Sequence, residues 1–195
     1  MIDEVREIIA KSIDTKRRII GSEELCKNIS IAAEMLINTY KNDGKVLLCG
    51  NGGSASDAQH IEGELVGRFQ MERRALPAIA LASSGATMTA IGNDYSYADV
   101  FSRQVAAHGN TGDILIGIST SGNSASVIRA VETAKNNGMT AIALLGRDGG
   151  ACKSIADVTI IVPSDVTARI QECHIMIGHI WCGLIEDALF GNSNE

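Results

Sequence analysis

The sequence lacks features that define several large classes of proteins. No apolar run approaches the roughly 18 residues of a membrane-spanning helix, and the N-terminus has neither the basic region nor the apolar stretch of a secretory signal. Basic residues are also outnumbered, with 17 Lys and Arg against 23 Asp and Glu and a net charge of −6. This balance argues against non-specific nucleic acid binding, which needs a cationic surface. We expect a cytoplasmic protein.

Paired cysteines are missing as well. The five cysteines are odd in number, scattered along the chain and without a Cys-x-x-Cys pair; they are Cys26, Cys49, Cys152, Cys173 and Cys182. With this spacing, neither a disulfide framework nor a Cys-rich zinc site is expected. We interpret the cysteines as small buried hydrophobic residues in a reducing compartment.

The sequence does contain an alternation of strand and helix patterns. Five short apolar runs are predicted to be strands: residues 45–50, 77–82, 113–119, 139–146 and 157–163. Their nearly continuous apolar centres are typical of parallel strands that helices cover on both faces. Helical patterns such as residues 124–137 lie between them. The 195 residues, 45% of them hydrophobic, are therefore predicted to form one α/β domain, a five-stranded parallel sheet in a flavodoxin-like three-layer sandwich.

Additional helices are expected at both ends of this domain. Residues 3–20 place apolar side chains along one stripe, Ser22 is expected to cap a second helix, and residues 167–190 form a long helix that is apolar on most sides. So much apolar surface around a modest sheet predicts a homo-oligomer. Residues 1–43 would be a helical oligomerisation segment and residues 44–190 the α/β core. The alternative is that these helices fold back on their own sheet.

Two loops rich in glycine and serine follow predicted strands and open predicted helices. Residues 50–57 read Gly-Asn-Gly-Gly-Ser-Ala-Ser-Asp, and residues 119–124 read Ser-Thr-Ser-Gly-Asn-Ser. Ligands bind at this edge of open α/β sheets, where glycines admit an anion and free N–H groups and hydroxyls donate to it. Neither loop has the Gly-Lys-Ser/Thr ending of a Walker A motif or a well-spaced dinucleotide fingerprint. A sugar phosphate is favoured over a nucleotide, with ordinary turns as the alternative.

Two of the predicted helices carry polar groups suited to chemistry. His60 and Glu64 are four residues apart and share one helix face, with Asp57 one turn upstream. A surface contact is the plainer interpretation of such a pair, but this helix starts at the proposed phosphate loop. The final helix contains Arg169, Gln171, Glu172, His174 and His179. Polar groups on a buried helix must be networked or functional, so both helices are candidates for the site.

These residues together resemble a known family. The segments that carry the resemblance are the Gly-Asn-Gly-Gly-Ser loop, Asp-Ala-Gln-His at 57–60, Gly-Asn-Asp at 92–94, the loop at 119–124, Arg-Ile-Gln-Glu at 169–172 and His179. In this order they are similar to the motifs of the sugar isomerase (SIS) family and, within it, of the phosphoheptose isomerases. The resemblance covers about residues 45–190. The loops mark the fold in general, whereas Glu64 together with His179 marks the isomerase.

The resemblance implies an aldose–ketose isomerase. Its reaction would convert sedoheptulose 7-phosphate to D-glycero-D-manno-heptose 7-phosphate through an enediol, the first step toward nucleotide-activated heptoses. Glu64 would be the base at C1, and His179 would move protons between the two oxygens. The residues implied to bind substrate are Asn51, Gly52, Gly53, Ser54, Glu64, Asn93, Asp94, Ser119, Thr120, Ser121, Ser124, Gln171 and, from a neighbouring subunit, Arg68.

The resemblance also implies a metal ion and an assembly. One zinc ion per subunit would bind to His60, Glu64, Gln171 and His179, and would polarise the carbonyl as a Lewis acid. Gln171 and His179 are eight residues apart, about 12 Å along one helix, so both reach one ion only if their side chains lean together. The implied assembly is a homotetramer with active sites shared between subunits.

Two alternatives share the fold and the loops. A non-enzymatic SIS protein that binds the bacterial replication initiator lacks the glutamate and the late histidine, both of which this chain has as Glu64 and His179. An N-acetylmuramate 6-phosphate etherase is usually longer, and an arabinose 5-phosphate isomerase often carries regulatory domains for which 195 residues leave no room. The isomerase hypothesis requires that Glu64 and His179 flank one pocket.

Overall fold

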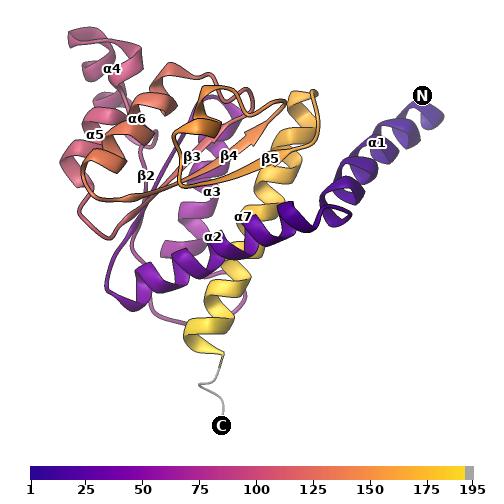
Figure 1. The fold of residues 1–195 in the computed structure, drawn as a ribbon, viewed down its shortest axis with the longest axis horizontal. Coiled ribbons are helices and arrows are strands. Elements are labelled where there is room, and N and C mark those ends of the chain that lie inside the picture. Colours follow the sequence, from indigo (N-terminus) through magenta and orange to yellow (C-terminus); the bar gives the residue numbers. More distant parts are fainter. Residues whose placement is uncertain (192–195) are drawn as a thin grey trace.

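The computed structural model describes residues 1–191, and its centre is a parallel sheet of five strands (Figure 1). The strands are β1 (Val46–Gly50), β2 (Ala78–Ala80), β3 (Ile114–Ser119), β4 (Thr140–Gly146) and β5 (Val158–Val162). Their order is β2-β1-β3-β4-β5, and all neighbouring pairs are parallel. The predicted fold class is confirmed. β2 is shorter than the predicted residues 77–82 because this edge strand pairs with β1 alone. Residues 192–195 of the predicted domain 1–195 lie outside the described residues.

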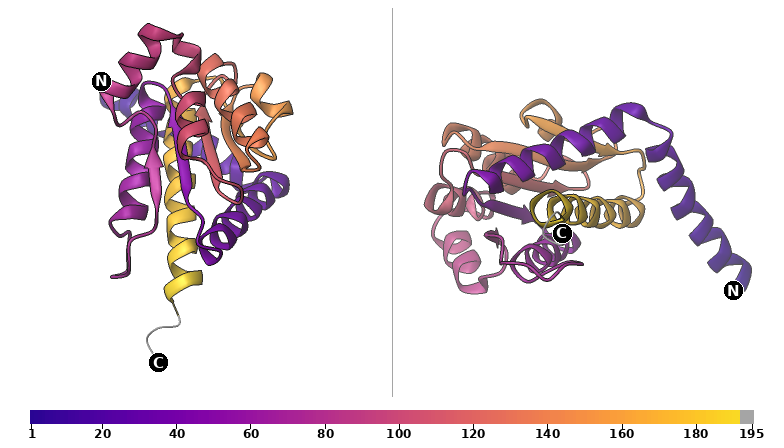
Figure 2. Two further views of the ribbon diagram at one scale, coloured as in Figure 1. Left: turned by 90° about the vertical axis from the view of Figure 1, so that its left-hand side faces the viewer. Right: turned by 90° about the horizontal axis from the view of Figure 1, so that it is seen from below.

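Helices cover both faces of the sheet, which makes three layers (Figures 1 and 2). The α-helices are α1 (Ile2–Ile20), α2 (Glu23–Lys41), α3 (Gly53–Val66), α4 (Gly85–Asp94), α5 (Ser102–His108), α6 (Ala125–Asn136) and α7 (Thr167–Phe190), with 3-10 helices η1 (Tyr97–Asp99) and η2 (Ala151–Ser154). Side chains of α2, α3 and α7 pack on one face of the sheet, and those of α5 and α6 pack on the other.

The two cores follow from the alternation of side chains along each strand. In β1, Val46 and Leu48 face the core that contains α2, α3 and α7, while Leu47 and Cys49 face the core beneath α6. All five β1 residues are buried, as the continuous apolar pattern predicted. Trp181 of α7 is also buried, and its indole N–H donates to the carbonyl of Ile29 in α2 at 3.0 Å. This bond fixes α7 against α2 on the same face of the sheet.

The two N-terminal helices differ: one folds back on its own sheet, and the other leaves its apolar side exposed. Ser22 caps α2 as predicted, since its hydroxyl accepts from the Leu25 N–H at 3.3 Å. α2 then folds back on its own sheet. α1 instead extends away from the body of the molecule (Figure 2). Its apolar stripe is left exposed, at 53% for Ile8 and 54% for Ile9. An oligomerisation role for residues 1–43 stays a prediction, and this exposed apolar surface supports it.

Within the described residues, α7 is the one helix long and apolar enough to cross a membrane. The prediction that no apolar stretch approaches a membrane span was therefore wrong by mean hydropathy, although histidines and acidic residues interrupt this helix. α7 is packed between α2, α3 and the sheet, and Ile177, Trp181 and Ile185 are buried there. A core helix of a folded domain meets the same criterion, so α7 is weak evidence for a membrane span.

Four of the five cysteines are buried, as interpreted from their spacing: Cys49, Cys152, Cys173 and Cys182. Burial raises the pKa of Cys152 to about 11 and that of Cys182 to about 12, so both thiols are protonated and unreactive. Cys26 is exposed, which corrects the interpretation for that residue. It lies in the first turn of α2, beside the point where α1 leaves the body of the molecule.

His174 is a structural histidine whose burial makes a prediction about pH. Its Nε2 lies 2.9 Å from the Leu145 carbonyl and must donate to it, while the buried Nδ1 has no hydrogen-bond partner among residues 1–191. Burial lowers the pKa of His174 to about 4, from 6.5. Between these values the unfolded chain binds a proton that the folded protein excludes, so stability rises with pH over that range, by about 3 kcal/mol from this group. The His174→Gln variant should lose this part of the slope in urea unfolding at pH 4 to 7; an unchanged slope would contradict the assignment.

Candidate functional site

The site forms where the order of the strands reverses. The crossover from β1 leads to β2 at one edge of the sheet, whereas the crossover from β3 leads to β4 toward the other edge. Their divergence leaves a crevice at the carboxyl ends of β1 and β3. Both loops singled out in the sequence begin there, because Gly50 of β1 pairs with Ile118 of β3. The first loop leads into α3 and the second into α6. The topology therefore brings together two segments that are about 70 residues apart in the chain.

A cavity of about 280 Å³ opens between these loops. Its lining residues are Asn51, Ser54, Ile118, Ser119, Thr120, Ser121, Ser124, Thr167 and Gln171. Seven of the nine are among the residues expected to bind substrate, and none carries a formal charge. The cavity also lies at the N-terminus of the 12-residue helix α6, where unpaired N–H groups favour an anion.

The serine hydroxyls of this cavity are arranged to donate. Ser119 Oγ accepts from the Gly122 N–H at 3.1 Å, and Ser121 Oγ accepts from the Asn123 N–H at 3.2 Å. Each oxygen thus has an internal donor, and its own proton is left for a ligand. Gly122 makes the tight turn possible, because its φ of +66° is unfavourable for other residues and a Cβ would collide with the Gly149 carbonyl.

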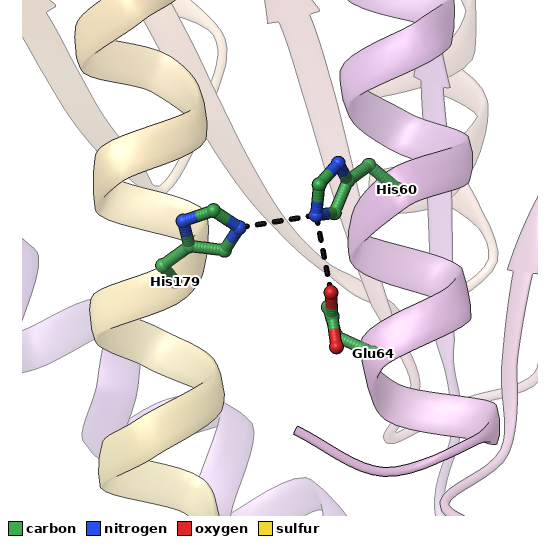
Figure 3. A group of neighbouring side chains, drawn as sticks. All are labelled: His60, Glu64 and His179. Atoms are coloured by element: carbon green, nitrogen blue, oxygen red, sulfur yellow. Dashed lines mark hydrogen bonds and ion pairs between the residues drawn. The ribbon is translucent and has the colours of Figure 1, made fainter. Parts of the chain in front are cut away.

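A second group of side chains lies between α3 and α7 (Figure 3). His60 Nε2 is 3.1 Å from Glu64 Oε1 and 3.1 Å from His179 Nε2. The ligand atoms of all three residues lie within 4.8 Å of one another. The ring of Phe69 stacks on His179, with 5.5 Å between centroids. The structure thus brings Glu64 and His179 together in one group of side chains. His179 lines a cavity whose lining does not include Glu64, so a single pocket flanked by both residues stays a prediction.

The cavity and this His–Glu–His group are joined by the pairing of α3 with α7. Gln171 lies against Gly53, where a Cβ would come within 2.5 Å of its amide nitrogen. His60 contacts His179 two turns further along. The helices therefore run side by side in the same direction, and about 10 Å of α3 separates Gly53 from His60. Gln171 lines the anion cavity, so its predicted role as a zinc ligand beside His179 stays a prediction.

Asp57 lies on α3 between the two parts of the site. Its Oδ2 atom is buried, and none of the described residues donates a hydrogen bond to it. Burial raises the pKa of Asp57 to about 6, an effect that the nearby His60 partly offsets. The carboxylate thus has an unused acceptor one turn from His60, on the heading that the sequence suggested.

Six of the thirteen residues expected to bind substrate do not line this cavity: Gly52, Gly53, Glu64, Asn93, Asp94 and Arg68. Asn93 and Asp94 end α4, are exposed, and bond to each other, with Asn93 Nδ2 donating to Asp94 Oδ1 at 2.9 Å. Arg68 is 60% exposed and lies 3.7 Å from Glu72. Their predicted contacts with substrate stay predictions. Arg68 follows α3 directly, where it is free to meet a neighbouring subunit.

The sequence analysis missed a buried ion pair that supports the site. Glu186 of α7 accepts from Arg73 Nε at 2.9 Å and from three successive N–H groups, those of Phe69, Gln70 and Met71, at 2.8 to 2.9 Å. Arg73 in turn donates to the carbonyl of Glu64 at 2.6 Å. Burial acts to raise the pKa of Glu186, but these donors outweigh it and hold the pKa below its usual value. The signal available in the sequence was the position of Glu186, an acidic residue within the most apolar helix, which indicates a buried partner of opposite charge.

The topology and the hydroxyl cavity define a class of protein. An open parallel sheet with two such loops at its switch point is the architecture of the sugar isomerase (SIS) proteins, and the family model described as "SIS domain" matches residues 9–146. The phosphoheptose isomerase of Clostridium acetobutylicum is 52% identical over 183 residues, which cover 94% of this chain and 93% of that protein. The chain belongs to the phosphoheptose isomerase family.

Solved structures agree with this assignment. A phosphoheptose isomerase from Francisella tularensis matches with a TM-score of 0.91 and 42% identity, over 95% of this chain and 98% of that one. The phosphoheptose isomerase of Neisseria gonorrhoeae matches with a TM-score of 0.89 and 46% identity over the same shares. The chain is therefore an enzyme of the isomerase class, and the predicted family and fold are confirmed.

Proposed function

We propose that this enzyme interconverts sedoheptulose 7-phosphate and D-glycero-D-manno-heptose 7-phosphate. The observation that carries the proposal is that Glu64 and His179 lie close together between α3 and α7, two to three turns along these helices from the uncharged anion cavity. A heptose 7-phosphate has its phosphate and its carbonyl at opposite ends of the carbon chain. The cavity would hold the phosphate, and the reacting carbons would lie beside Glu64. Such a step opens the synthesis of nucleotide-activated heptoses.

The chemistry follows from what the two side chains can do. Moving a carbonyl between C2 and C1 requires removal of a proton from one carbon and its return to the other, through an enediol. Glu64, 26% exposed and hydrogen-bonded to His60, supplies a carboxylate base for that proton. His179 supplies an imidazole that passes a proton between the two oxygens, and its stacking on Phe69 fixes the plane of the ring. Both transfers return each group to its starting state.

The same side chains fit a zinc ion. Two imidazole nitrogens and a carboxylate oxygen are common zinc donors, and those of His60, Glu64 and His179 lie within 4.8 Å of one another. We include Gln171 as a fourth candidate ligand, as the resemblance implies. A bound zinc ion would supply Lewis acidity at the carbonyl oxygen. The His60 side chain is 48% exposed, so an ion bound there would be accessible from solvent.

Metal removal should be measurable in binding as well as in activity. We expect the metal-free protein to turn over sedoheptulose 7-phosphate more slowly and to regain its rate when zinc is added. Calorimetry should show that His60→Gln weakens zinc binding, by about 10-fold or more, because a ligand is lost. The matched control is His108→Gln, at an exposed histidine at the end of α5, which should bind zinc as the wild type does. Full activity of the metal-free protein would make His60 structural.

The assembly we propose is a cytoplasmic homotetramer with sites at its subunit interfaces. Two features support contacts between copies: the exposed apolar stripe of α1, and a cavity of about 540 Å³ beside His179 that opens on α7 and is lined by Phe69, Met176, Ile180 and Leu184 among others. Arg68, exposed at the end of α3, would reach the site of a neighbour. Sedimentation of the purified protein tests the tetramer.

A turnover assay tests the function itself. Purified protein should consume sedoheptulose 7-phosphate and form the aldose phosphate. The alternative of a non-catalytic SIS protein that binds the replication initiator is not favoured, because relatives at 50 to 52% identity are phosphoheptose isomerases. No turnover, together with tight binding to an initiator protein, would reverse this conclusion.

A further inference from the structure

Tyr97 contacts Asn51, a residue that lines the anion cavity, from a segment that no motif marked. It opens the 3-10 helix η1, and its hydroxyl lies 2.8 Å from Asn51 Oδ1. The side-chain oxygen of an asparagine can only accept, so the Tyr97 hydroxyl donates this hydrogen bond. Its ring is otherwise 60% exposed. The hydroxyl therefore makes a directed contact from a side chain with little other packing.

The other end of the Asn51 amide points at two serines. Asn51 Nδ2 lies 2.8 Å from Ser124 Oγ and 3.0 Å from Ser126 Oγ, and the two serine oxygens are 3.2 Å apart. With two N–H bonds, the amide donates one to each serine. Ser126 is buried, so its own proton is directed to Ser124 Oγ. Ser124 then accepts from both sides.

This arrangement decides where the Ser124 proton points. Because Ser124 Oγ accepts from Asn51 and from Ser126, its remaining hydrogen faces the cavity that it lines. A phosphate oxygen there can only accept. The opposite orientation of the Asn51 amide would place Oδ1 beside Ser124 and take up that proton. A phenol donates hydrogen bonds more readily than it accepts them, so Tyr97 favours the orientation observed.

The segment that holds Tyr97 is itself fixed. Asp99, two residues on, accepts from Ser96 Oγ and from Arg129 of α6, each at 2.5 Å. These two hydrogen bonds, of which the Ser96 bond is the larger influence, hold the pKa of Asp99 below its usual value. η1 is thereby tied to the same helix, α6, that starts at the cavity. Tyr97 and Ser124 keep their relative positions because both are anchored to α6.

We propose that Tyr97 is a positioning residue for phosphate binding, because its hydroxyl orients the Asn51 amide so that the Ser124 proton is left for a phosphate oxygen. The inference rests on the proposed function for the identity of the ligand, and on the hydrogen bonds above for the role of Tyr97. Tyr97 acts through Asn51, not through contact with the reacting carbons. It should therefore influence the affinity for the phosphate group and leave the proton transfers alone.

The test compares Tyr97→Phe with the wild type, and uses Tyr95→Phe as the matched control. Tyr95 is a neighbouring exposed tyrosine whose ring packs under Arg103 at 3.9 Å, a contact that phenylalanine retains. Calorimetric titration of the full-length protein with inorganic phosphate should show a Kd about fivefold weaker in Tyr97→Phe, the effect of one net hydrogen bond, and an unchanged Kd in Tyr95→Phe. With sedoheptulose 7-phosphate, KM should rise by the same factor at constant kcat.

A double variant shows whether Tyr97 acts through Asn51. In the Asn51→Ala background, Tyr97→Phe should have no further effect on the phosphate Kd, since the amide it orients is gone. Wild-type phosphate affinity in Tyr97→Phe, an additive loss in the double variant, or a fall in kcat at constant KM would each overturn the proposal. If the wild type binds phosphate but does not isomerise the heptose, the proposed function fails while the Tyr97 comparison still decides this inference.

Discussion

Glu64→Gln is expected to lower kcat for sedoheptulose 7-phosphate by about 10²- to 10⁴-fold, the range of a positioned general base. Glutamine has nearly the same shape but cannot take a proton from carbon. KM should change little, because Ser54, the residue of α3 that lines the anion cavity, lies about three turns away from Glu64 and is untouched. Steady-state kinetics on the purified variant measure both quantities.

Two controls separate the loss of a base from other effects. Glu62→Gln makes the same change two residues earlier on α3, where the side chain lies near Ser83 outside the His–Glu–His group, and should retain activity. Bound zinc must be measured in both variants because Glu64 is also a candidate ligand. Turnover within about threefold of wild type would remove Glu64 as the base. A deficit that disappears when zinc is saturated would assign Glu64 to metal binding alone.

Glu186→Gln is expected to lower the free energy of unfolding by about 3 to 5 kcal/mol, because it leaves the guanidinium of Arg73 buried without its counter-charge. The Arg73 and Glu186 side chains are 1% and 2% exposed, so water cannot replace the lost partner. The three N–H groups that bind Glu186 belong to the segment carrying Phe69, which packs on His179. In urea, the Glu186→Gln variant should therefore lose activity at a lower concentration than the one that unfolds it, because the segment that holds Phe69 against His179 is released first.

Asp187→Asn is the matched control for this change, since Asp187 is the next residue of α7 and is exposed. Urea unfolding of both variants and the wild type gives the three free energies. We expect Asp187→Asn to lie within about 0.5 kcal/mol of the wild type. A similarly small effect of Glu186→Gln would mean that the N–H donors alone retain the segment and that Arg73 finds another partner.

The sheet and its layers were predictable because their pattern is local. Continuous apolar runs identify buried parallel strands, and the Ser22 cap and the spacing of α7 identify helices, without knowledge of what they touch. The predicted pairing of Glu64 with His179 came from the resemblance. No periodicity relates two residues that are 115 positions apart, and only the parallel packing of α3 on α7 brings them together.

The supporting contacts were not predictable for a related reason. Glu186, Arg73 and Tyr97 lie in no motif, and each acts through a partner that is distant in the chain. Their hydrogen bonds depend on side-chain directions that composition and spacing do not encode. The exposed position of Cys26 has the same origin, since burial was inferred from residue type, whereas the departure of α1 from the body of the molecule decides it.

The pairing of α3 with α7 has a consequence for which sugars are accepted. The packing of these two helices fixes the distance between the anion cavity and Glu64. A ketose phosphate with five or six carbons, anchored by its phosphate, would leave its carbonyl short of the base and would act as an inhibitor before it acted as a substrate. We therefore expect any selection by chain length to depend on the spacing of the two helices, and to persist when single residues of the cavity are replaced.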